Sequence, residues 1–436
     1  MRRVAVVGSG IAGLGVAHAL ACDTQNPTHV TLFEAGSHFG GHAHTVDVTL
    51  DGITHGVDTG FLVFNERTYP NLIRLLADLG VPTARSDMSF SVSLPLAGRQ
   101  LEWSGSSLDT VFAQRRNLAS PAFLSMLRDL LRFNRQATQL ASGQRADDGA
   151  ALTLGAFLEH HGYGQPFRDW YLLPMAGAIW SCPIETMLAY PAATFIRFCH
   201  NHGLLQVNDR PQWFTVAGGA RQYVQRIAAG LPNVRVDDPV LEVKRNRALS
   251  KVMVRSRHGS AAYDQVVLAC HSDQSLRLLV DASDEERSVV SAVAYQPNRA
   301  ILHTDTRLLP RSRKVWSAWN YQSDGGSLAA GPNLAVTYLL NKLQPLPFRT
   351  PVLVSLNPFV EPDPAQVLAE FDYAHPVFDR AAIEAQRRLP QVQGRDQVWF
   401  AGAWTGFGFH EDGLKSGLAV AEAIRARAKR PLPLAA

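Results

Sequence analysis

The chain has 436 residues and a formal net charge of +4, with 46% hydrophobic and 18% charged residues. This composition excludes a disordered chain and predicts a globular protein, and the length favours two domains. Lysine and arginine are spread without a long basic run, which argues against nucleic acid as a partner.

The N-terminal segment VAVVGSGIAGLGVAHAL predicts a strand, a tight turn and a helix. Val4 to Val7 form a short apolar run, as in a buried parallel strand. In the GxGxxG spacing that follows, Gly8 makes the turn, Gly10 lets the backbone approach a pyrophosphate, and Gly13 lets the helix pack on the strand. The positive end of the helix from about Ile11 then faces the phosphates. The segment also resembles a secretory signal, but cleavage would destroy this turn.

A second predicted strand, HVTLFE, ends at Glu34, which stands 21 residues after Gly13 (34 − 13). An acidic residue at this distance accepts hydrogen bonds from ribose hydroxyls, so the segment predicts a dinucleotide site. The alternative is a glycine-rich turn with no ligand. The glycine pair Gly40 and Gly41 follows, and then His42.

GxGxxG, an acid, and a GG pair followed by Arg or His together resemble the flavin-containing amine oxidase superfamily. The resemblance implies FAD, an α/β Rossmann-type domain built from discontinuous segments, and an α+β substrate domain with an antiparallel sheet. No cluster of Cys or carboxylates stands at metal-ligand spacing, so no metal is expected. The resemblance places these residues at the cofactor: Gly8, Gly10, Ile11, Ala12, Gly13, Glu34, Ala35, Gly40, Gly41, His42, Gly60, Val240, Gly402, Ala403, Gly413 and Leu414.

Residues 123–136, FLSMLRDLLRFNRQ, predict an amphipathic helix. Its apolar stripe contains Phe123, Leu127 and Leu130. A second stripe carries the arginines Arg128, Arg132 and Arg135. A basic amphipathic helix can lie at a lipid interface, although such a stripe more often packs on the core. The following segment, ASGQRADDGA at 141–150, predicts an exposed loop.

Further along the chain, residues 213–231 predict a turn and a helix, and residues 233–270 predict successive strands. Residues 331–359 predict an antiparallel sheet broken by prolines. Residues 396–424 predict a strand, a glycine-rich turn and a closing helix. We therefore expect an FAD-binding domain built from 1–84, 211–275 and 391–436, and a substrate domain built from 85–210 and 276–390.

The closing turn contains FGFHEDGLKSG, which the resemblance places near the flavin ring. His410 and Glu411 are candidates to bind the flavin, orient substrate or take a proton. The alternative is that Glu411 and Asp412 cap the last helix, and this role is favoured for Asp412. The superfamily has an acid where this chain has Ala403, and Thr405 is a candidate substitute. The superfamily lysine near the flavin has only Lys314 and Lys342 as positional candidates.

The segment VWSAWNYQ supplies aromatic and amide groups at strand-like alternation. Tyr321 and Asn320 are candidate catalytic residues, and Trp316 and Trp319 are candidates to line a substrate tunnel. Trp180, in IWSCP, is a further candidate for the substrate cavity. Ordinary core packing is the alternative for each of the tryptophans.

Longer motifs carry a closer resemblance: DTGFLVFNERTYPNL, SDMSFSVSL, IWSCP, FCHNHGLLQ, RPQW, VWSAWNYQ, HPVFD and GFHEDGL. They resemble bacterial FAD-dependent proteins that accompany cyclopropane-fatty-acid-synthase-like methyltransferases, and the N-terminal half of plant cyclopropane fatty acid synthases. One branch resembles the desaturase of furan fatty acid synthesis, which oxidises a methylated acyl chain of a membrane phospholipid.

The resemblance implies an FAD-dependent oxidoreductase that desaturates a phospholipid acyl chain by hydride transfer to flavin N5. Two alternatives remain: a flavin-bearing accessory subunit of a fatty-acid methyltransferase, and an oxidase of small amines. The expected partners are a phospholipid acyl chain, a methyltransferase and the membrane surface. Four cysteines without a CxxC pair indicate a reduced compartment, and no apolar run is long enough to span a bilayer, so we expect a cytoplasmic protein peripheral to the inner membrane face.

Overall fold

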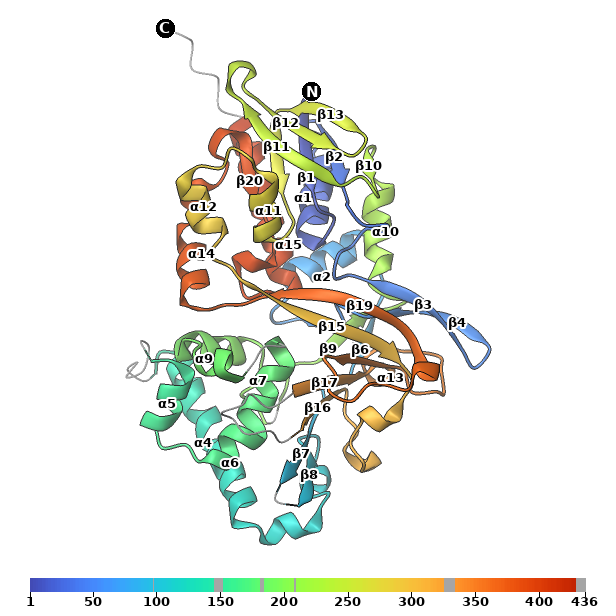
Figure 1. Ribbon diagram of the computed structural model, residues 1–436, viewed down its shortest axis with the longest axis vertical. Coiled ribbons are helices and arrows are strands. Elements are labelled where there is room, and N and C mark those ends of the chain that lie inside the picture. Colours follow the sequence, from blue (N-terminus) through green and yellow to red (C-terminus); the bar gives the residue numbers. More distant parts are fainter. Residues whose placement is uncertain (97, 145–151, 181–183, 208, 325–333, 429–436) are drawn as a thin grey trace.

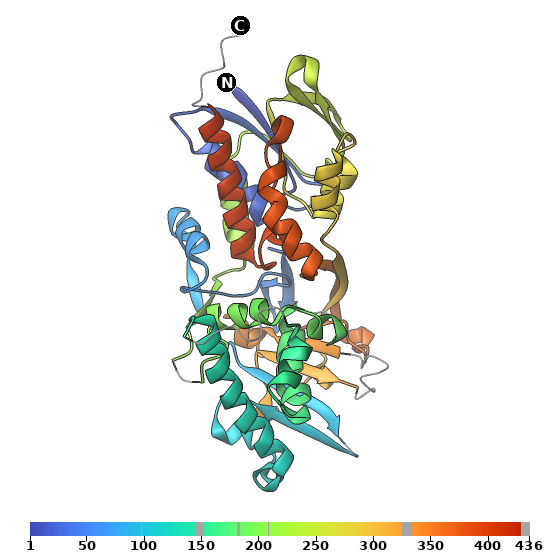
Figure 2. The same ribbon diagram turned by 90° about the vertical axis from the view of Figure 1, so that its left-hand side faces the viewer.

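Two β-sheets lie toward opposite ends of an elongated molecule (Figures 1 and 2). The computed structural model describes residues 1–96, 98–144, 152–180, 184–207, 209–324 and 334–428. The upper end in Figure 1 holds a parallel sheet with helices on both faces, and the lower end holds a mixed sheet covered by helices. The expected exposed loop at 141–150 falls largely outside the described residues.

The upper sheet is entirely parallel, with strand order β10-β2-β1-β14-β20. Its strands come from three distant parts of the chain, within 1–84, 211–275 and 391–436. They are β1 (Arg2–Val7), β2 (Thr28–Phe33), β10 (Val234–Arg235), β14 (Gln265–Leu268) and β20 (Val398–Phe400). The strands β1, β2, β14 and β20 are mostly buried and read as apolar runs rather than alternating ones, whereas the short edge strand β10 is exposed.

Successive residues of β1 pack into different layers, as the pleat of a strand requires. Val4 and Val6 join the core that includes α1 (Ile11–Ala21), α10 (Arg221–Ala229) and α15 (His410–Ala428). Ala5 and Val7 join the core on the other face. That face is covered by α11 (Ser272–Leu278), α12 (Asp284–Val290), α14 (Arg380–Val392) and the antiparallel strands β11 (Val240–Asn246), β12 (Lys251–Ser256) and β13 (Gly259–Tyr263).

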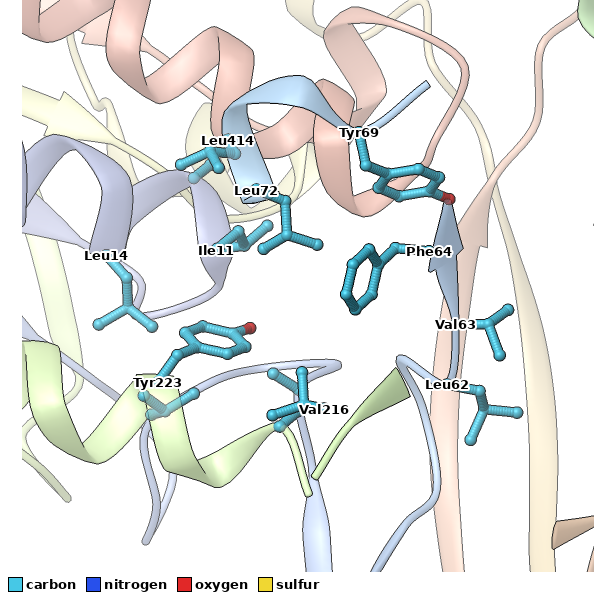
Figure 3. Close-up of a cluster of buried hydrophobic side chains, with 14 of the residues drawn as sticks. Ile11, Leu14, Leu62, Val63, Phe64, Tyr69, Leu72, Val216, Tyr223 and Leu414 are labelled. Atoms are coloured by element: carbon cyan, nitrogen blue, oxygen red, sulfur yellow. The ribbon is translucent and has the colours of Figure 1, made fainter. Parts of the chain in front are cut away.

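Helices α1 and α15 approach each other so closely that glycine is needed where they meet. A Cβ atom on Gly413 would lie 2.8 Å from Cγ2 of Ile11, and one on Gly417 would lie 2.3 Å from the carbonyl oxygen of Ala12. Leu414 packs in a hydrophobic cluster with residues of α1, α10 and α2 (Pro70–Asp78) (Figure 3). Gly413 and Leu414 therefore hold the two helices together.

The lower sheet is mixed and has the order β19-β15-β18-β17-β16-β7-β8. Only the pairing of β7 with β16 is parallel. The strands are β7 (Phe90–Leu96), β8 (Arg99–Ser104), β15 (Tyr295–His303), β16 (Trp319–Ser323), β17 (Leu334–Leu339), β18 (Leu353–Leu356) and β19 (Val367–Pro376). The long pair β15 and β19 runs across the middle of the molecule, between its two ends (Figure 1).

Helices from the middle of the chain cover the lower sheet (Figures 1 and 2). They are α3 (Leu108–Val111), η1 (Arg115–Ala119), α4 (Pro121–Ala141), α5 (Leu154–His160), α6 (Gln165–Phe167), α7 (Leu173–Trp180), α8 (Ile184–Leu188) and α9 (Ala192–Asn201), with a π-helical turn at Arg168–Leu172. The predicted helix at 123–136 lies inside α4.

Smaller elements connect the two ends. A hairpin is formed by β3 (Thr45–Leu50) and β4 (Ile53–Asp58), and a three-stranded sheet is formed by β5 (Phe64–Asn65), β9 (Trp213–Val216) and β6 (Thr83–Ser86). Helix α13 (Leu340–Leu343) follows β17 directly. No helix within the described ranges is both long enough and apolar enough to cross a bilayer.

The expected limits of the substrate domain, 276 and 390, do not match the packing. The core of the parallel sheet includes residues of two helices from this range: Val289 and Val290 of α12, and Ala382 and Ala385 of α14. The two helices therefore cover the nucleotide-binding end although both lie within 276–390. The apolar faces of the two helices pack in a layer with residues from distant parts of the chain. A local sequence pattern does not indicate such packing.

Candidate functional site

A cavity of about 670 Å³ lies between the parallel sheet and the lower sheet. One part follows the turn after β1 and the carboxyl end of β2, where Gly8, Ser9, Gly10 and Glu34 line it. The other part is walled by aromatic and aliphatic side chains from the lower half. In open parallel sheets, a nucleotide usually binds at the carboxyl ends of the strands. The site lies at the topological switch point, where the strand order reverses.

The first turn holds Glu34 by several hydrogen bonds. Oε2 accepts from the backbone N–H of Ser9, 3.0 Å away, and from its hydroxyl group, and Oε1 accepts from the N–H of Gly36 at 2.8 Å. The carboxylate is therefore fixed at the cavity wall. Ser9 was not singled out from the sequence, because the GxGxxG pattern leaves that position free.

The residues of this turn fit FAD. A Cβ atom on Gly10 would meet nothing within 4 Å, so the space above the turn is open, whereas one on Gly13 would lie 1.9 Å from the carbonyl oxygen of Gly8. No side chain caps the amino end of α1, which leaves its first N–H groups for an anion. Nε2 of His42 is buried without a partner, an arrangement that a bound polar group would relieve.

Most residues expected at the cofactor line this cavity. They are Gly8, Gly10, Ile11, Ala12, Glu34, Ala35, Gly40, Gly41, His42, Gly60, Val240, Gly402 and Ala403. Gly13, Gly413 and Leu414 do not line it. Gly13 packs α1 on β1, and the other two pack α15 on α1, so their glycine and leucine character follows from helix packing.

At the C-terminal turn, Ala403 stands beside an indole rather than a carboxylate. Thr405 is not the substitute, because its hydroxyl donates to the carbonyl oxygen of Gly402 at 2.9 Å and the side chain does not line the cavity. Trp404 lines the cavity instead, and its Nε1 is buried without a partner. A Cβ atom on Gly402 would lie 2.5 Å from this indole, so glycine is needed to seat it.

His410, the first residue of α15, reaches the cavity. Its ring stacks on Phe61, with ring centroids 3.8 Å apart, and its Nε2 lies 2.6 Å from the hydroxyl oxygen of Tyr223. Burial lowers the pKa of His410 to about 3, so the imidazole is neutral at physiological pH. It can accept or donate a hydrogen bond at the cavity wall, but it supplies no positive charge there.

Glu411 points away from the cavity, which corrects the expectation that it acts there. Its Oε1 accepts from the backbone N–H and the side-chain amide of Asn71, and its Oε2 accepts from the N–H of Leu72. These groups lie in the first turn of α2. The carboxylate thus caps α2, whose preceding residue Tyr69 provides no cap of its own.

Asp412 has the capping role that the sequence favoured. Its Oδ2 accepts hydrogen bonds from the backbone N–H groups of Phe407 and Phe409, each 3.0 Å away. Phe409 directly precedes α15, so the contact is the half of a capping box in which the third helical residue reaches back. Burial raises the pKa of Asp412 to about 6.

The aromatic strand segment is only partly at the cavity. Trp319 lines it and packs edge-on against Tyr338, with ring centroids 4.8 Å apart. Tyr321 is buried instead against Gly177 of α7.

Asn320 and Trp316 also lie away from the cavity. Asn320 is buried in the sheet, where it bonds Ser91, the backbone of Ser317 and the carbonyl of Thr337. Trp316 packs on an apolar cluster beside β17 and donates Nε1–H to the carbonyl of Pro310.

These positions correct the catalytic assignment of Asn320 and Tyr321 and the tunnel assignment of Trp316. Of the remaining candidate, Trp180, only the backbone at the end of α7 is described. Cys182, in the same IWSCP segment, lies outside the described residues.

The two lysines considered from the sequence are engaged elsewhere. Nζ of Lys314 lies 2.6 Å from Asp109, and Nζ of Lys342 lies 3.1 Å from Asp87. Among the described residues, no lysine lines the cavity, and Glu34 is its only carboxylate. The part of the cavity beyond the flavin turns therefore has no anionic side chain in the described chain.

Several lining residues could not be singled out from the sequence. His202 follows α9, and its Nδ1–H donates to the carbonyl oxygen of Phe198 at 3.1 Å, so Nε2 of the neutral ring is an acceptor. Burial lowers the pKa of His202 to about 4. The others are Tyr69, Tyr373, His375, Phe407 and Phe409. The only sequence signal for His202 was its place in FCHNHGLLQ.

Comparisons with known proteins identify the family and the fold of the chain. A family model for flavin containing amine oxidoreductases matches residues 11–425. Cyclohexylamine oxidase from Brevibacterium oxydans superposes with a TM-score of 0.70 at 16% identity, covering 98% of this chain and 100% of that chain. A putrescine oxidase gives 0.69 at 17% identity, covering 98% and 99%. A fatty acid isomerase from P. acnes gives 0.67 at 16% identity, covering 98% of both chains.

The family match spans nearly the whole chain and confirms the expected α/β flavoprotein fold. FAD is the cofactor, and the protein is an FAD-dependent oxidoreductase. When bound, FAD would supply the redox chemistry, and the glycine turns that line the cavity are the segments that would hold it. The chain therefore belongs to the flavin containing amine oxidoreductase family.

Proposed function

We propose that this protein oxidises the fatty acyl chain of a phospholipid, removing two hydrogens to form a carbon–carbon double bond. The hydride passes to FAD, and the proton leaves from the neighbouring carbon to an acceptor on the protein. The observation that carries the proposal is the character of the cavity beyond the flavin turns. The long sequence motifs shared with the flavoproteins of lipid methylation support the same substrate class.

This outer part of the cavity is apolar and uncharged. Its side chains include Ile179, Leu204 and Leu356, with Phe198, Phe407 and Phe409 beside them. An alkyl chain gains about 0.8 kcal/mol per methylene group buried in such surroundings. Two histidines of the lining, His202 and His375, are neutral at physiological pH, because burial lowers the pKa of each to about 4. The lining suits a hydrocarbon chain.

A small amine is a weaker match for the same lining. An ammonium group gains most from a carboxylate or from aromatic faces that replace its hydration. Among the described lining residues the one carboxylate is Glu34, at the nucleotide end and held by Ser9 and Gly36. The fold itself does not decide, because similar folds occur in amine oxidases and in a fatty acid isomerase.

His202 is our candidate for the proton acceptor. The hydrogen bond from Nδ1–H to Phe198 fixes the tautomer, so Nε2 carries a lone pair. His202 lines the cavity, and its ring is nearly perpendicular to that of Tyr69, with the ring centroids 6.5 Å apart. His410 is less suited, since its Nε2 is already paired with the hydroxyl of Tyr223.

The proposal is tested by mixing the FAD-loaded protein without oxygen with phospholipids that carry methylated or unmethylated acyl chains, and with cyclohexylamine and putrescine. We expect loss of the oxidised-flavin absorbance with at least one lipid and not with the amines. A flavin that is reduced by an amine and by none of the lipids contradicts the proposal. Mass spectrometry of the recovered lipid must show the loss of two hydrogens. A methyltransferase partner stays a prediction from the sequence.

A further inference from the structure

The end of the molecule farthest from the parallel sheet carries exposed leucines between arginines. The segment runs from β8 through α3 and η1 along α4 and lies at the lower end of Figure 1. Leu108 is 79% exposed, Leu118 53% and Leu131 56%. Exposed apolar patches mark interaction sites, and the exposure of these leucines makes this end of the molecule a candidate.

The outer face of α4 joins leucine and arginine in one stripe. Leu124, Arg128, Leu131 and Arg135 follow at intervals of four, three and four residues, so they share a face, and all four are exposed. This stripe is not the one that the sequence suggested. Phe123 is buried, and Leu127 and Leu130 are half-buried against the core.

Arg132, which the sequence placed in the basic stripe, is also turned inward. Its guanidinium donates to the carbonyl oxygens of His161 and Gly162 and lies over the ring of Tyr163, 4.1 Å from the centroid. The outward face is therefore left to the leucines and to Arg128 and Arg135.

Positive charge predominates at this end of the molecule. Residues 99–135 contain six arginines, no lysine and three acidic residues. Two of the acids are buried: Glu102 accepts from the backbone of Arg311 and Ser312, and Asp129 accepts from the N–H of Gly164. The third acid, Asp109, is paired with Arg115 and Lys314. The arginines that face solvent thus outnumber exposed acids.

We propose that this surface, formed by Leu108, Leu118, Leu124, Leu131, Arg115, Arg116, Arg128 and Arg135, docks on an anionic lipid bilayer. The leucines enter the interface and the arginines bind the phosphate groups of the lipid headgroups. A bilayer fits better than a protein partner because exposed leucines and arginines alternate along one face of α4, as in helices that lie at a lipid interface.

Docking here brings the protein to its substrate. The buried face of α4 packs on α9, whose Phe198 lines the cavity, so a single helix layer separates the surface from the lining. The biological reason for docking rests on the proposed function, since an acyl chain must leave a bilayer to reach the cavity. The docking itself needs no turnover and is measured separately.

The experiment is sedimentation of the FAD-loaded protein with vesicles of phosphatidylcholine alone and of equal parts phosphatidylcholine and phosphatidylglycerol. We expect binding to the mixed vesicles. The double variants Leu124→Ser with Leu131→Ser and Arg128→Gln with Arg135→Gln should each weaken this binding roughly tenfold or more. Matched controls at the opposite end, Leu241→Ser with Leu249→Ser and Arg247→Gln with Arg387→Gln, should bind as the wild type does.

Three outcomes would overturn the docking surface: no binding of the wild type, equal binding of all variants, or a surface that proves to join two copies of the chain in gel filtration without binding vesicles. Flavin reduction by detergent-dispersed phospholipid separates docking from catalysis. Reduction without vesicle binding removes the docking and leaves the proposed function. Vesicle binding through this surface, with a flavin that no lipid reduces, supports the docking and removes the proposed function.

Discussion

Glu411 and Asn71 lie 340 positions apart in the chain, yet the carboxylate of Glu411 accepts both the backbone N–H of Asn71, at 2.9 Å, and its side-chain amide, at 2.6 Å. A third bond from the N–H of Leu72 completes the contact. Glu411, in the last helix, thereby accepts hydrogen bonds from free N–H groups in the first turn of α2. Tyr69, which directly precedes α2, lines the cavity.

Glu411→Ala should therefore act on stability more than on chemistry. Loss of a cap and of buried hydrogen-bond partners costs about 1–3 kcal/mol, measured as the free energy of unfolding in urea. Glu411→Gln should recover part of this, because the amide oxygen still accepts. Glu422→Ala, an exposed site on the same helix, is the control. A catalytic role would instead appear as slow flavin reduction with unchanged stability.

The glycines of the first turn should separate cofactor binding from folding. Gly10→Ala places a methyl group in open space and should leave the fold of the apoprotein unchanged while weakening FAD binding. Gly13→Ala forces a Cβ atom to 1.9 Å from the carbonyl of Gly8 and should reduce soluble expression or the free energy of unfolding. FAD affinity by fluorescence titration and thermal unfolding of the apoprotein report the two effects. Equal behaviour of the two variants would contradict this division.

His202→Ala should slow flavin reduction by lipid roughly 10²- to 10⁴-fold if Nε2 takes the substrate proton. FAD affinity should stay unchanged, because the ring lies in the outer part of the cavity. Stopped-flow reduction rates should be measured across pH. If His202 takes the proton, the acidic limb of the wild-type pH profile should disappear in His202→Ala, whereas a purely structural role would leave the shape of the profile unchanged. His200→Ala, two residues away and outside the cavity lining, is the matched control.

Leu204→Trp should narrow the outer cavity and slow reduction by long acyl chains. Leu204 lines the cavity just after α9, so an indole at that position occupies space that the alkyl chain needs. We expect a roughly tenfold loss in kcat/KM with long-chain lipids and a smaller loss with short-chain lipids. Leu204→Ile keeps the volume and serves as the control. If chain length makes no difference, the substrate does not pass this side chain.

Asp58 makes the stability of the protein depend on pH in a recognisable direction. It accepts from the N–H of Ala220 and from the side chains of Thr45 and Gln344, and burial raises its pKa to about 6. A carboxyl whose pKa is raised in the folded state stabilises most below its unfolded pKa of about 4, and this contribution is lost as pH rises through 6. The stability of Asp58→Asn relative to the wild type should rise by about 2 kcal/mol between pH 4 and pH 7. Unfolding curves that run parallel would exclude this.

The first nucleotide-binding turn was predictable because its determinants are local. GxGxxG and the acid at the end of the second strand fix β1, α1 and β2 and leave little choice of ligand. The strand Trp319–Ser323 was also predictable, but the sequence did not show which of its side chains reach the cavity. Trp319 and Tyr321 share a face by strand geometry, yet Trp319 meets the cavity and Tyr321 meets α7, because the helix covers only part of that face.

The HED triplet shows the limit of local reasoning most clearly. The sequence left a chemical role open for His410 and Glu411 and favoured a capping role for Asp412, and the structure divides the three among different tasks. His410 faces the cavity, Glu411 caps a distant helix and Asp412 caps its own. Only Asp412 has a partner within a few residues, so only its role could be predicted from spacing.

The glycine contacts between α1 and α15 also bear on how the protein is made. A ribosome releases residues 11–21 long before residues 410–428, so during most of synthesis the first helix has no partner for its glycine-lined face. The strand that completes the parallel sheet, β20, is made equally late. The part of the cavity wall formed by Gly402 and Ala403 is therefore assembled only after more than 400 residues have been synthesised.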